Sequence, residues 1–283
     1  MTSSMGRRRF LAVIPAFNEQ GAIRRVVAGV REILPEADVL VIDDGSSDRT
    51  MDEALAAGAL VVRHPVNLGI GATVQTGLRF ACEEGYEIVF RLDGDGQHNP
   101  ADLPQLFAAL RDHRVDSVFG SRFLGVDSMM KIPVARRLGI SCFRTLVTML
   151  IRQRVTDSTS GLCCFNRRSV EVLAKYLPQD YPEVEGRVVL HKAGLASVEV
   201  PVQMLPRTTG VSSIDGWRSI YYALKVSLAV LITGIKDIPL VAASSAPERA
   251  ERSSYGNTVR TAYHSYHLQR HLDGSDRAAD PPA

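Results

Sequence analysis

The sequence predicts an α/β fold in which a mostly parallel sheet is flanked by helices. Short apolar runs alternate with stretches whose apolar positions recur at helical spacing through the first two-thirds of the chain. This alternation is typical of strand–helix–strand units, whose strands pair in parallel. The 283 residues, 45% of them hydrophobic, are enough for a sizeable core, and we expect one main domain over residues 9–215.

Five apolar runs predict the strands of this sheet. The first, Phe10–Ile14, has no polar residue, as expected of a strand that is buried on both faces. The other predicted strands lie at residues 38–42, 59–62, 87–92 and 117–119. Helical patterns separate them, and residues 72–82 are one such pattern.

Capping signals predict where three of the helices begin. Asn18 can cap a helix whose apolar positions fall on one face. Thr50 and Glu53 fit a capping box at the start of the next helix. Asn99 and Pro100 predict an N-cap followed by a proline in the first turn. The inward-facing residues of this last helix are expected to be Leu103, Leu106, Phe107 and Leu110.

Composition and cysteine spacing exclude several classes of protein. The formal net charge of +2 gives no reason to expect nucleic-acid binding. The cysteine spacing fits neither a zinc site nor a disulfide framework, so we expect buried, reduced thiols at Cys82, Cys142, Cys163 and Cys164. No apolar run is long enough for a transmembrane helix. Residues 244–283 are expected to be a disordered tail with incidental histidines at His264, His267 and His271.

Polar, mostly acidic loops follow three of the predicted strands, at residues 15–19, 43–48 and 93–98. Ligands of parallel α/β sheets bind outside the carboxyl ends of the strands, so these loops mark the expected site. A dinucleotide is not expected there. Gly69 and Gly71 lack the third glycine of that fingerprint, and they follow the third strand instead of the first.

Asp93 and Asp95 form a D-x-D sequence at the end of the fourth strand. Two carboxylates held together repel each other unless a cation neutralises them. A hard divalent cation binds few protein oxygens and completes its coordination with phosphate and water. The pair therefore predicts a site for a metal–diphosphate complex. The alternative interpretation is a plain turn shaped by Gly94 and Gly96.

Seven short stretches match the motifs of one family in the same order. They lie at residues 13–19, 41–48, 67–71, 92–98, 120–123, 157–161 and 207–213. Together they resemble the inverting glycosyltransferases of family 2, and within that family the dolichyl/polyprenyl-phosphate mannose synthase-like branch. The resemblance covers most of the chain. It implies a Rossmann-like GT-A fold and metal-dependent transfer of a sugar, with inversion, from a UDP- or GDP-sugar.

The resemblance also implies a role for each matched residue at the donor site. The residues that would bind the nucleotide-sugar donor are Pro15, Phe17, Glu19, Asp44, Asp93 and Gly94. Asp93 and Asp95 would serve catalysis by holding Mg²⁺ or Mn²⁺, with Gln97 as a third ligand. A metal there would stabilise the charge that develops on the nucleoside diphosphate as the glycosidic bond breaks.

On the acceptor side, Arg122 and Arg207 lie where the family uses cations on donor or acceptor phosphate. Glu183 and Glu185 are candidate general bases for a hydroxyl acceptor, with Glu185 preferred, or else acids favoured at a helix start. A phosphate acceptor needs no base. We expect polyprenyl phosphate as the acceptor, or alternatively a hydroxyl of a lipid-linked glycan or cell-surface polysaccharide. A nucleotide-binding module without catalysis is the alternative from another class.

Two segments suit the surface of a membrane. Residues 131–154 carry six basic and no acidic side chains among apolar ones, as in a basic amphipathic helix at an anionic membrane or a helix that covers the sheet. Residues 216–243 are expected to form an amphipathic helix, either interfacial or docked on the core, since its apolar run is too short to span a bilayer. We expect a cytoplasmic enzyme, peripheral at the inner face of the cell membrane.

Overall fold

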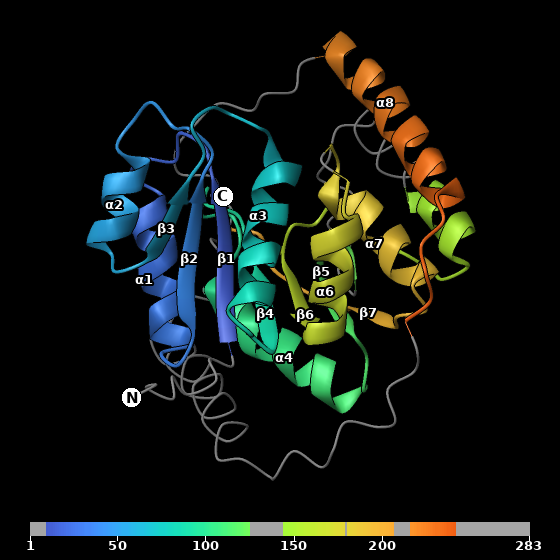
Figure 1. Cartoon of the computed structure of the whole chain (residues 1–283), viewed down its shortest axis with the longest axis horizontal. Coiled ribbons are helices and arrows are strands. Elements are labelled where there is room, and N and C mark those ends of the chain that lie inside the picture. Colours follow the sequence, from blue (N-terminus) through green and yellow to red (C-terminus); the bar gives the residue numbers. More distant parts are fainter. Residues whose placement is uncertain (1–9, 125–143, 179, 207–215, 242–283) are drawn as a thin grey trace, which may run out of the picture. The chain divides into compact units, whose positions relative to one another are not determined.

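The computed structural model of the protein describes residues 10–124, 144–178, 180–206 and 216–241, the last with side chains from residue 225 onward. One seven-stranded sheet runs through this described part (Figure 1). Its strands are β1 (Phe10–Ala16), β2 (Asp38–Asp43), β3 (Leu60–Arg63), β4 (Ile88–Arg91), β5 (Ser117–Ser121), β6 (Cys163–Asn166) and β7 (Ser197–Pro201). Their order across the sheet is β3-β2-β1-β4-β6-β5-β7. Only β6 runs antiparallel to its neighbours in this sheet, so the predicted mostly parallel α/β fold is confirmed.

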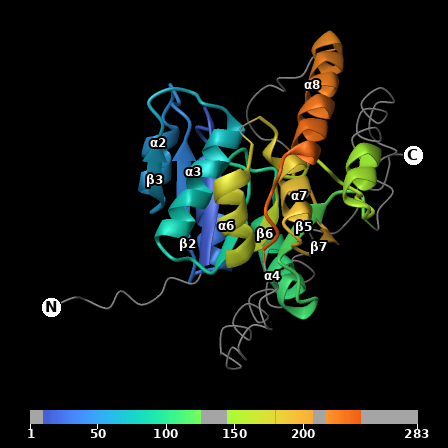
Figure 2. The ribbon, with the colours of Figure 1, turned by 45° about the vertical axis from the view of Figure 1, so that its right-hand side comes forward.

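Helices cover both faces of the sheet. They are α1 (Ile23–Ile33), α2 (Thr50–Ala56), α3 (Ile70–Glu83), the short 3₁₀ helix η1 (Pro100–Asp102), α4 (Leu103–Asp112), α6 (Arg167–Tyr176), α7 (Pro182–Lys192) and α8 (Gly216–Ile235). Residues 144–151 are also helical. α3 and α6 pack side by side on one face with α7 beside them, whereas α1 and α4 contact the opposite face (Figures 1 and 2).

Alternate residues of β1 point to opposite faces of the sheet, as its pleat requires. Leu11 and Val13 are buried in a cluster beneath α3, α6 and α7. Phe10 faces the other way, and its ring packs edge-to-face on Phe107 of α4, with 5.3 Å between the ring centroids. On the α3 side, Gly77 lies so close to Val13 that an added Cβ would come within 2.3 Å of the valine side chain. β1 is therefore buried on both faces, as its sequence predicts.

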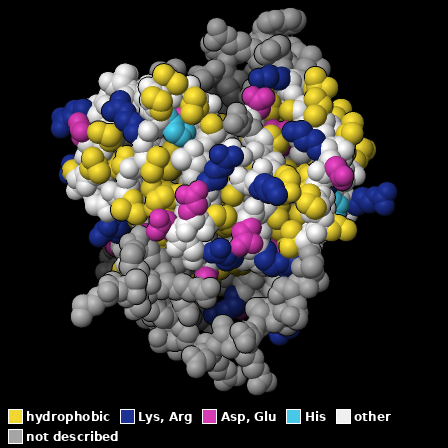
Figure 3. Space-filling model, viewed as in Figure 1, with side chains coloured by type: hydrophobic (Ala, Val, Ile, Leu, Met, Phe, Trp, Pro, Cys, Tyr) yellow, Lys and Arg dark blue, Asp and Glu magenta, His cyan; other side chains and the backbone are white. Residues whose placement is uncertain are grey.

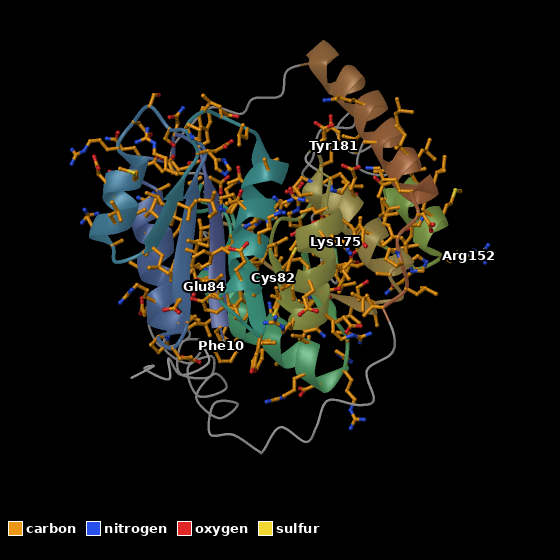
Figure 4. All side chains as sticks on the ribbon, viewed as in Figure 1. Phe10, Cys82, Glu84, Arg152, Lys175 and Tyr181 are labelled. Atoms are coloured by element: carbon orange, nitrogen blue, oxygen red, sulfur yellow. The ribbon has the colours of Figure 1, made fainter. Side chains whose placement is uncertain are left out.

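A second, smaller apolar cluster joins α7, α8 and the helix at residues 144–151. Its members are Val147, Ile151, Val155, Tyr181, Val184, Val188, Val226 and Val230. Figure 4 labels Tyr181, which lies at the start of α7. One face of α8 is thus docked on the protein, and the segment that contains α8 is not separate from the main fold.

The five predicted strands are confirmed, with ends that differ by one or two residues. The predicted helix at residues 72–82 corresponds to α3, and Asn99 caps η1 through a hydrogen bond from the Ala101 N–H to its side-chain oxygen. β3 lies at an edge of the sheet, so its side chains are partly exposed. The apolar pattern does not predict β6 and β7, because each is short and is defined by its pairing with the distant β5.

Two predicted helix caps are wrong, because the side chains bind a neighbouring loop instead. Asn18 lies ahead of α1 in a left-handed conformation with φ 56°, and its side-chain oxygen accepts a hydrogen bond from the Ser47 N–H. Thr50 and Glu53 accept hydrogen bonds from backbone N–H groups in the loop after β1. These side chains therefore tie together the loops that follow β1 and β2.

Cys163 and Cys164 are buried and Cys82 is half-buried, and all three are free thiols. Burial raises the pKa of the Cys163 thiol to about 12, so this group stays protonated. Several expectations fall outside the described residues, namely those for Cys142, Arg207, residues 131–143 and the tail with its three histidines. In the part of the chain that is described, no helix has the length and apolar character needed to cross a membrane.

Candidate active site

The carboxyl ends of β1, β2 and β4 meet at one rim of the sheet, because these strands are parallel neighbours. A cleft of about 320 Å³ lies at this rim. The sequence-predicted residues on its wall are Pro15, Phe17, Glu19, Asp44, Asp93, Gly94 and Asp95. Ala16 and residues just before and in the first turn of α3 complete the lining, the latter at Asn67, Gly69, Ile70 and Thr73. The structure therefore brings the six predicted donor-binding residues into one cavity.

Asp44 hydrogen-bonds the backbone just before α3 and so holds this segment in the wall of the cleft. Its Oδ1 accepts a hydrogen bond from the Leu68 N–H at 3.0 Å, and its Oδ2 accepts one from the Gly69 N–H at 2.8 Å. The same Oδ1 lies 2.7 Å from Nδ1 of His64. A carboxylate has about four lone-pair positions, so Asp44 can shape the wall and still accept a hydrogen bond from a ligand. Phe17 is 45% exposed and leaves its ring surface available to a ligand.

Asp93 and Asp95 follow β4 and are held by different contacts. The Asp93 N–H donates to Nδ1 of His98 at 3.0 Å, which requires that ring nitrogen to be unprotonated. The Asp95 Oδ1 accepts a hydrogen bond from the Gln97 N–H at 2.9 Å. Burial acts to raise the pKa of the Asp93 carboxyl, but the charged guanidinium groups of Arg91 and Arg122 oppose it, and the net shift of that pKa is downward. Asp93 is therefore ionised at neutral pH.

The chemistry of these side chains fits a hard divalent cation. Two carboxylates and an amide lie within five residues at one strand end, which is an all-oxygen donor set of the kind that Mg²⁺ and Mn²⁺ accept. Within the described residues, no group of three or more His, Cys, Asp or Glu side chains is arranged to enclose a metal ion. Such a pair leaves most coordination positions for phosphate oxygens and water, as expected of a metal that binds together with a diphosphate.

A buried arginine connects Asp93 to α7. Arg91 is the last residue of β4, and its side chain is only 4% exposed. Its Nη2 donates to Asp93 Oδ1 at 3.3 Å and forms a short contact with Glu183 Oε1 in the first turn of α7. Burial acts to lower the pKa of Arg91, but Glu183 and Asp93 raise it, so the guanidinium remains charged. Glu183 is thereby held beside Asp93.

Glu185 occupies a different environment, although it is only two residues away on the same helix. Its Oε1 accepts a hydrogen bond from the Thr233 hydroxyl at 2.7 Å, and its Oε2 accepts one from the Tyr181 N–H at 3.2 Å. The residue is 2% exposed, and this burial raises the pKa of its carboxyl. Glu185 thus joins α7 to α8, whereas Glu183 contacts Arg91, which also bonds Asp93 after β4.

Arg122 lies directly after β5, at the same rim, and forms an ion pair with Asp157. Its Nε and Nη2 donate to the two carboxylate oxygens of Asp157 at 2.6 and 2.7 Å, which is the bidentate geometry of a guanidinium–carboxylate pair. The Asp157 side chain is fully buried, whereas that of Arg122 is 23% exposed. The charge of Arg122 also contributes to the lowered pKa of Asp93, so the two groups belong to one electrostatic site.

Sequence reasoning did not assign roles to Arg91 and Asp157. A signal for Arg91 was present, because a charged residue in an otherwise apolar predicted strand needs a buried partner. Asp157 lies in one of the stretches that match the family motifs. Nothing in the local sequence indicates that it forms an ion pair with Arg122, which is 35 residues away. Both partners are defined by contacts between distant segments.

The model of one protein family, described as glycosyl transferase family 2, matches residues 11–174. This match covers more than half of the chain. The chain belongs to glycosyl transferase family 2. The protein is therefore a glycosyltransferase, and the interpretation as a module without catalysis is not supported.

Three relatives illustrate the branch of the family that this glycosyltransferase resembles. Undecaprenyl-phosphate mannosyltransferase of Micrococcus luteus is 29% identical over 74% of the chain and 88% of the relative. Polyprenol monophosphomannose synthase of Mycolicibacterium smegmatis is also 29% identical, over 74% of the chain and 82% of the relative. UDP-N-acetylglucosamine–dolichyl-phosphate N-acetylglucosaminyltransferase of Methanococcus voltae is 26% identical, over 81% of the chain and the whole relative.

A solved structure has the same fold as this glycosyltransferase. Glucosyl-3-phosphoglycerate synthase from Mycobacterium tuberculosis, in complex with Mn²⁺, UDP and phosphoglyceric acid, superposes with a TM-score of 0.59. The superposition covers 81% of this chain and 80% of that one, at 22% identity. The predicted GT-A fold is therefore confirmed. Structures of that synthase contain Mn²⁺ or Mg²⁺ together with UDP.

Proposed function

We propose that this glycosyltransferase moves a sugar from a UDP- or GDP-sugar to a polyprenyl phosphate, with inversion at the anomeric carbon. One observation carries the proposal: the acidic cleft at the sheet rim lies in the same electrostatic site as Arg122, whose guanidinium is already oriented by Asp157. The three relatives whose names include undecaprenyl, polyprenol or dolichyl phosphate support the choice of acceptor.

The donor would lie in the cleft with its nucleotide against the loops that follow β1 and β2. Phe17 offers an exposed ring to the base, while Glu19 and Asp44 offer carboxylate oxygens to ribose hydroxyls. Gly94 lies in the cleft wall and packs closely against the loop after β1, because a Cβ there would come within 3.1 Å of the Pro15 carbonyl oxygen. These residues bind and orient the donor.

Asp93, Asp95 and the amide of Gln97 would hold Mg²⁺ or Mn²⁺. When bound, the cation supplies positive charge to the diphosphate of the leaving group. Asp93 is kept ionised and oriented for this task by its neighbours on β4 and in the following loop. Asp95 is 9% exposed and is fixed through the Gln97 N–H.

A phosphate oxygen of the acceptor would attack the anomeric carbon from the side opposite the diphosphate. A bond from that oxygen to carbon forms as the bond from carbon to the donor diphosphate breaks, and the nucleoside diphosphate leaves with the electron pair. Arg122 would bind the acceptor phosphate with the side of its guanidinium that faces away from Asp157, since the Nε–Nη2 edge is already bonded to that carboxylate. Arg207 is proposed to share this role. Because the phosphate is already ionised, no general base is needed.

Transfer to a hydroxyl is the second candidate, and the position of Glu183 favours it as the base of that reaction over Glu185. Glu183 lies beside Asp93 through Arg91, whereas both Glu185 oxygens bond to Thr233 and Tyr181. Glu183→Gln should therefore abolish transfer to a hydroxyl and leave most of the transfer to a phosphate. Glu185→Gln is the matched control on the same helix turn.

We also propose that the enzyme works as a peripheral protein at the inner face of the cell membrane. α8 is buried on one face, while Leu228, Leu231, Ile232 and Ile235 of its opposite face are 44% to 85% exposed. Figure 3 shows hydrophobic side chains gathered along α8, with Lys and Arg nearby. Arg152, labelled in Figure 4, points outward from the end of the neighbouring helix. Exposed apolar side chains with cations nearby suit an anionic bilayer surface, where a lipid acceptor resides.

The proposal is tested by incubating the purified protein with Mn²⁺, a UDP- or GDP-sugar and a short-chain polyprenyl phosphate. We expect one donor to release nucleoside diphosphate and to yield an equal amount of lipid-linked sugar phosphate. Asp95→Ala should reduce this rate by roughly 10²–10³-fold, whereas Asp52→Ala, on an exposed position of α2, should not. Turnover only with hydroxyl acceptors, or none with any donor in the presence of lipid vesicles, would overturn the choice of acceptor.

A further inference from the structure

We infer that Glu199 and Arg187 are positioning residues, which hold Asp157 and through it Arg122 in the orientation that binds the acceptor phosphate. This inference rests on the acceptor role proposed for Arg122. It assigns a function to a buried set of polar side chains on β7 and α7, outside the cleft that receives the donor.

The contact between Arg122 and Asp157 fixes the direction of the guanidinium. Besides its two side-chain bonds, the Asp157 carboxylate accepts a hydrogen bond from the Arg122 backbone N–H at 3.1 Å. Nη2 of Arg122 also donates to the Thr159 hydroxyl at 2.7 Å. An arginine held at its backbone and at both sides of its fork has little freedom, so its direction depends on where Asp157 lies.

Asp157 itself is held at its own peptide groups by two side chains from distant segments. Its N–H donates to Oε1 of Glu199 at 3.2 Å, and its carbonyl oxygen accepts from Nη2 of Arg187 at 2.8 Å. Oε2 of Glu199 accepts from both the backbone N–H and the hydroxyl of Thr156, at 2.8 and 2.6 Å. The segment that carries Asp157 therefore follows the placement of Glu199 and Arg187.

Glu199 and Arg187 form a buried ion pair, with 3.1 Å between Oε1 and Nη2 and side-chain exposures of 10% and 3%. The Arg187 guanidinium also lies 3.8 Å above the centre of the Phe119 ring. A buried ion pair is poor evidence for stability, because well-packed apolar residues of similar volume are often as stable. The bonds that this pair makes to the segment carrying Asp157 indicate an orienting role instead.

The placement of Arg187 on α7 joins the two halves of the site. Glu183 lies one helical turn earlier and contacts Arg91, which bonds Asp93 on the donor side. Arg187 contacts the carbonyl oxygen of Asp157, which bonds Arg122 on the acceptor side. One buried turn of α7 thus sets the spacing between the acids of the donor site and the cation of the acceptor site.

The test measures the Michaelis constant for polyprenyl phosphate and the dissociation constant for the donor in a set of variants. Glu199→Gln keeps the shape of the side chain but removes its charge and one acceptor oxygen. Asp157→Asn makes the equivalent change at the residue that lies between Glu199 and Arg122. We expect each to raise the acceptor Michaelis constant by roughly 10- to 100-fold, with donor affinity unchanged. Arg187→Lys keeps the positive charge but loses the planar guanidinium, and it should raise the acceptor Michaelis constant to a similar extent. This variant provides the test if Glu199→Gln does not fold.

Asp116→Asn is the matched control. Asp116 is also a buried aspartate beside β5 and bonds Arg168 at 2.9 Å, but it precedes the strand at the rim opposite the cleft. This variant should lose stability without changing the acceptor Michaelis constant. If Arg122→Gln raises that constant but the Glu199, Arg187 and Asp157 variants behave like Asp116→Asn, the inference is wrong and the proposed function stands. If Arg122→Gln leaves it unchanged, the acceptor role of Arg122 fails, and the inference fails with it.

Discussion

At the scale of single residues, Gly161 shows how closely the candidate metal site is packed. A Cβ built on this glycine would lie 2.7 Å from Asp93 Oδ2, closer than two such atoms can approach. Gly161→Ala should therefore displace the Asp93 carboxylate and weaken the activating effect of Mn²⁺ by roughly 10- to 100-fold, as for other changes around metal ligands. A titration of transferase activity with Mn²⁺ measures this effect.

Gly234→Ala is the control for that substitution. Its added Cβ would lie 3.3 Å from Leu150 Cδ2, between α8 and the helix at residues 144–151 and away from the cleft. We expect the same Mn²⁺ midpoint as in the original protein. Equal midpoints in both glycine variants would mean that Asp93 does not bind the cation.

Glu185 predicts a pH dependence of stability. Burial and Asp180 raise the pKa of its carboxyl, Thr233, Tyr181 and Lys236 oppose this, and the net shift is upward. A raised pKa means that the folded protein holds this proton more tightly than the unfolded chain. The stabilisation that protonated Glu185 contributes is therefore complete below pH 4.5, the ordinary pKa of the group. This stabilisation is lost as pH rises through the raised pKa of Glu185 in the folded protein.

Glu185→Gln should consequently be at least as stable as the original protein at pH 7, and its advantage should shrink as pH falls towards 4.5. The amide can keep both contacts, because a hydroxyl can accept as well as donate a hydrogen bond. Urea unfolding between pH 4 and pH 8 measures the difference. A variant that is less stable at pH 7 than at pH 4.5, relative to the original protein, would contradict the raised pKa.

At the scale of the elements, α8 has one buried and one exposed apolar face. Leu231 and Ile235 are 44% and 85% exposed, so replacing both with Gln should change the free energy of unfolding little. If this face enters a bilayer, the double variant should bind vesicles containing phosphatidylglycerol roughly tenfold or more weakly, since each buried aliphatic side chain contributes about 1.5–3 kcal/mol. Co-sedimentation with vesicles measures the binding.

The matched control for α8 is Leu60→Gln. Leu60 is 42% exposed, but it lies on β3 at the edge of the sheet. We expect its vesicle binding to equal that of the original protein. Unchanged binding by the α8 variant as well would exclude this helix face as the membrane contact.

At the scale of the whole molecule, ligand binding should stabilise the fold by mass action. A donor present at about 100 times its dissociation constant stabilises the native state by about 2.7 kcal/mol. For a domain of this size the melting temperature should rise by roughly 5–10 °C. Thermal unfolding with Mn²⁺ and each nucleotide-sugar measures the shift. Chelation of the metal with EDTA should remove most of it, and a shift that persists would argue against a metal-bound diphosphate.

The donor side and the acceptor side of the candidate site differ in how well the sequence predicts them. The donor side follows from strand order, because parallel strands place their carboxyl ends at one rim, and the loops after β1, β2 and β4 do line one cleft. The acceptor side does not follow, since Arg122 is positioned by Asp157, and Asp157 by side chains of β7 and α7. Two of the three predicted helix caps are wrong for the same reason, because the side chains of Asn18 and Thr50 bond a neighbouring loop instead.

The sequence by itself determined five of the seven strands of the described sheet, the faces of the helices and the acids at the rim, because the period of apolar residues records burial along the chain. Only the tertiary structure decided which of two neighbouring acids is connected to the site through Arg91. Glu183 and Glu185 are separated by about 200° around α7, so they point in opposite directions. Packing against β4 and α8 alone assigns Glu183 to Arg91 and Glu185 to Thr233, since local sequence carries no information about contacts across 92 and 48 residues.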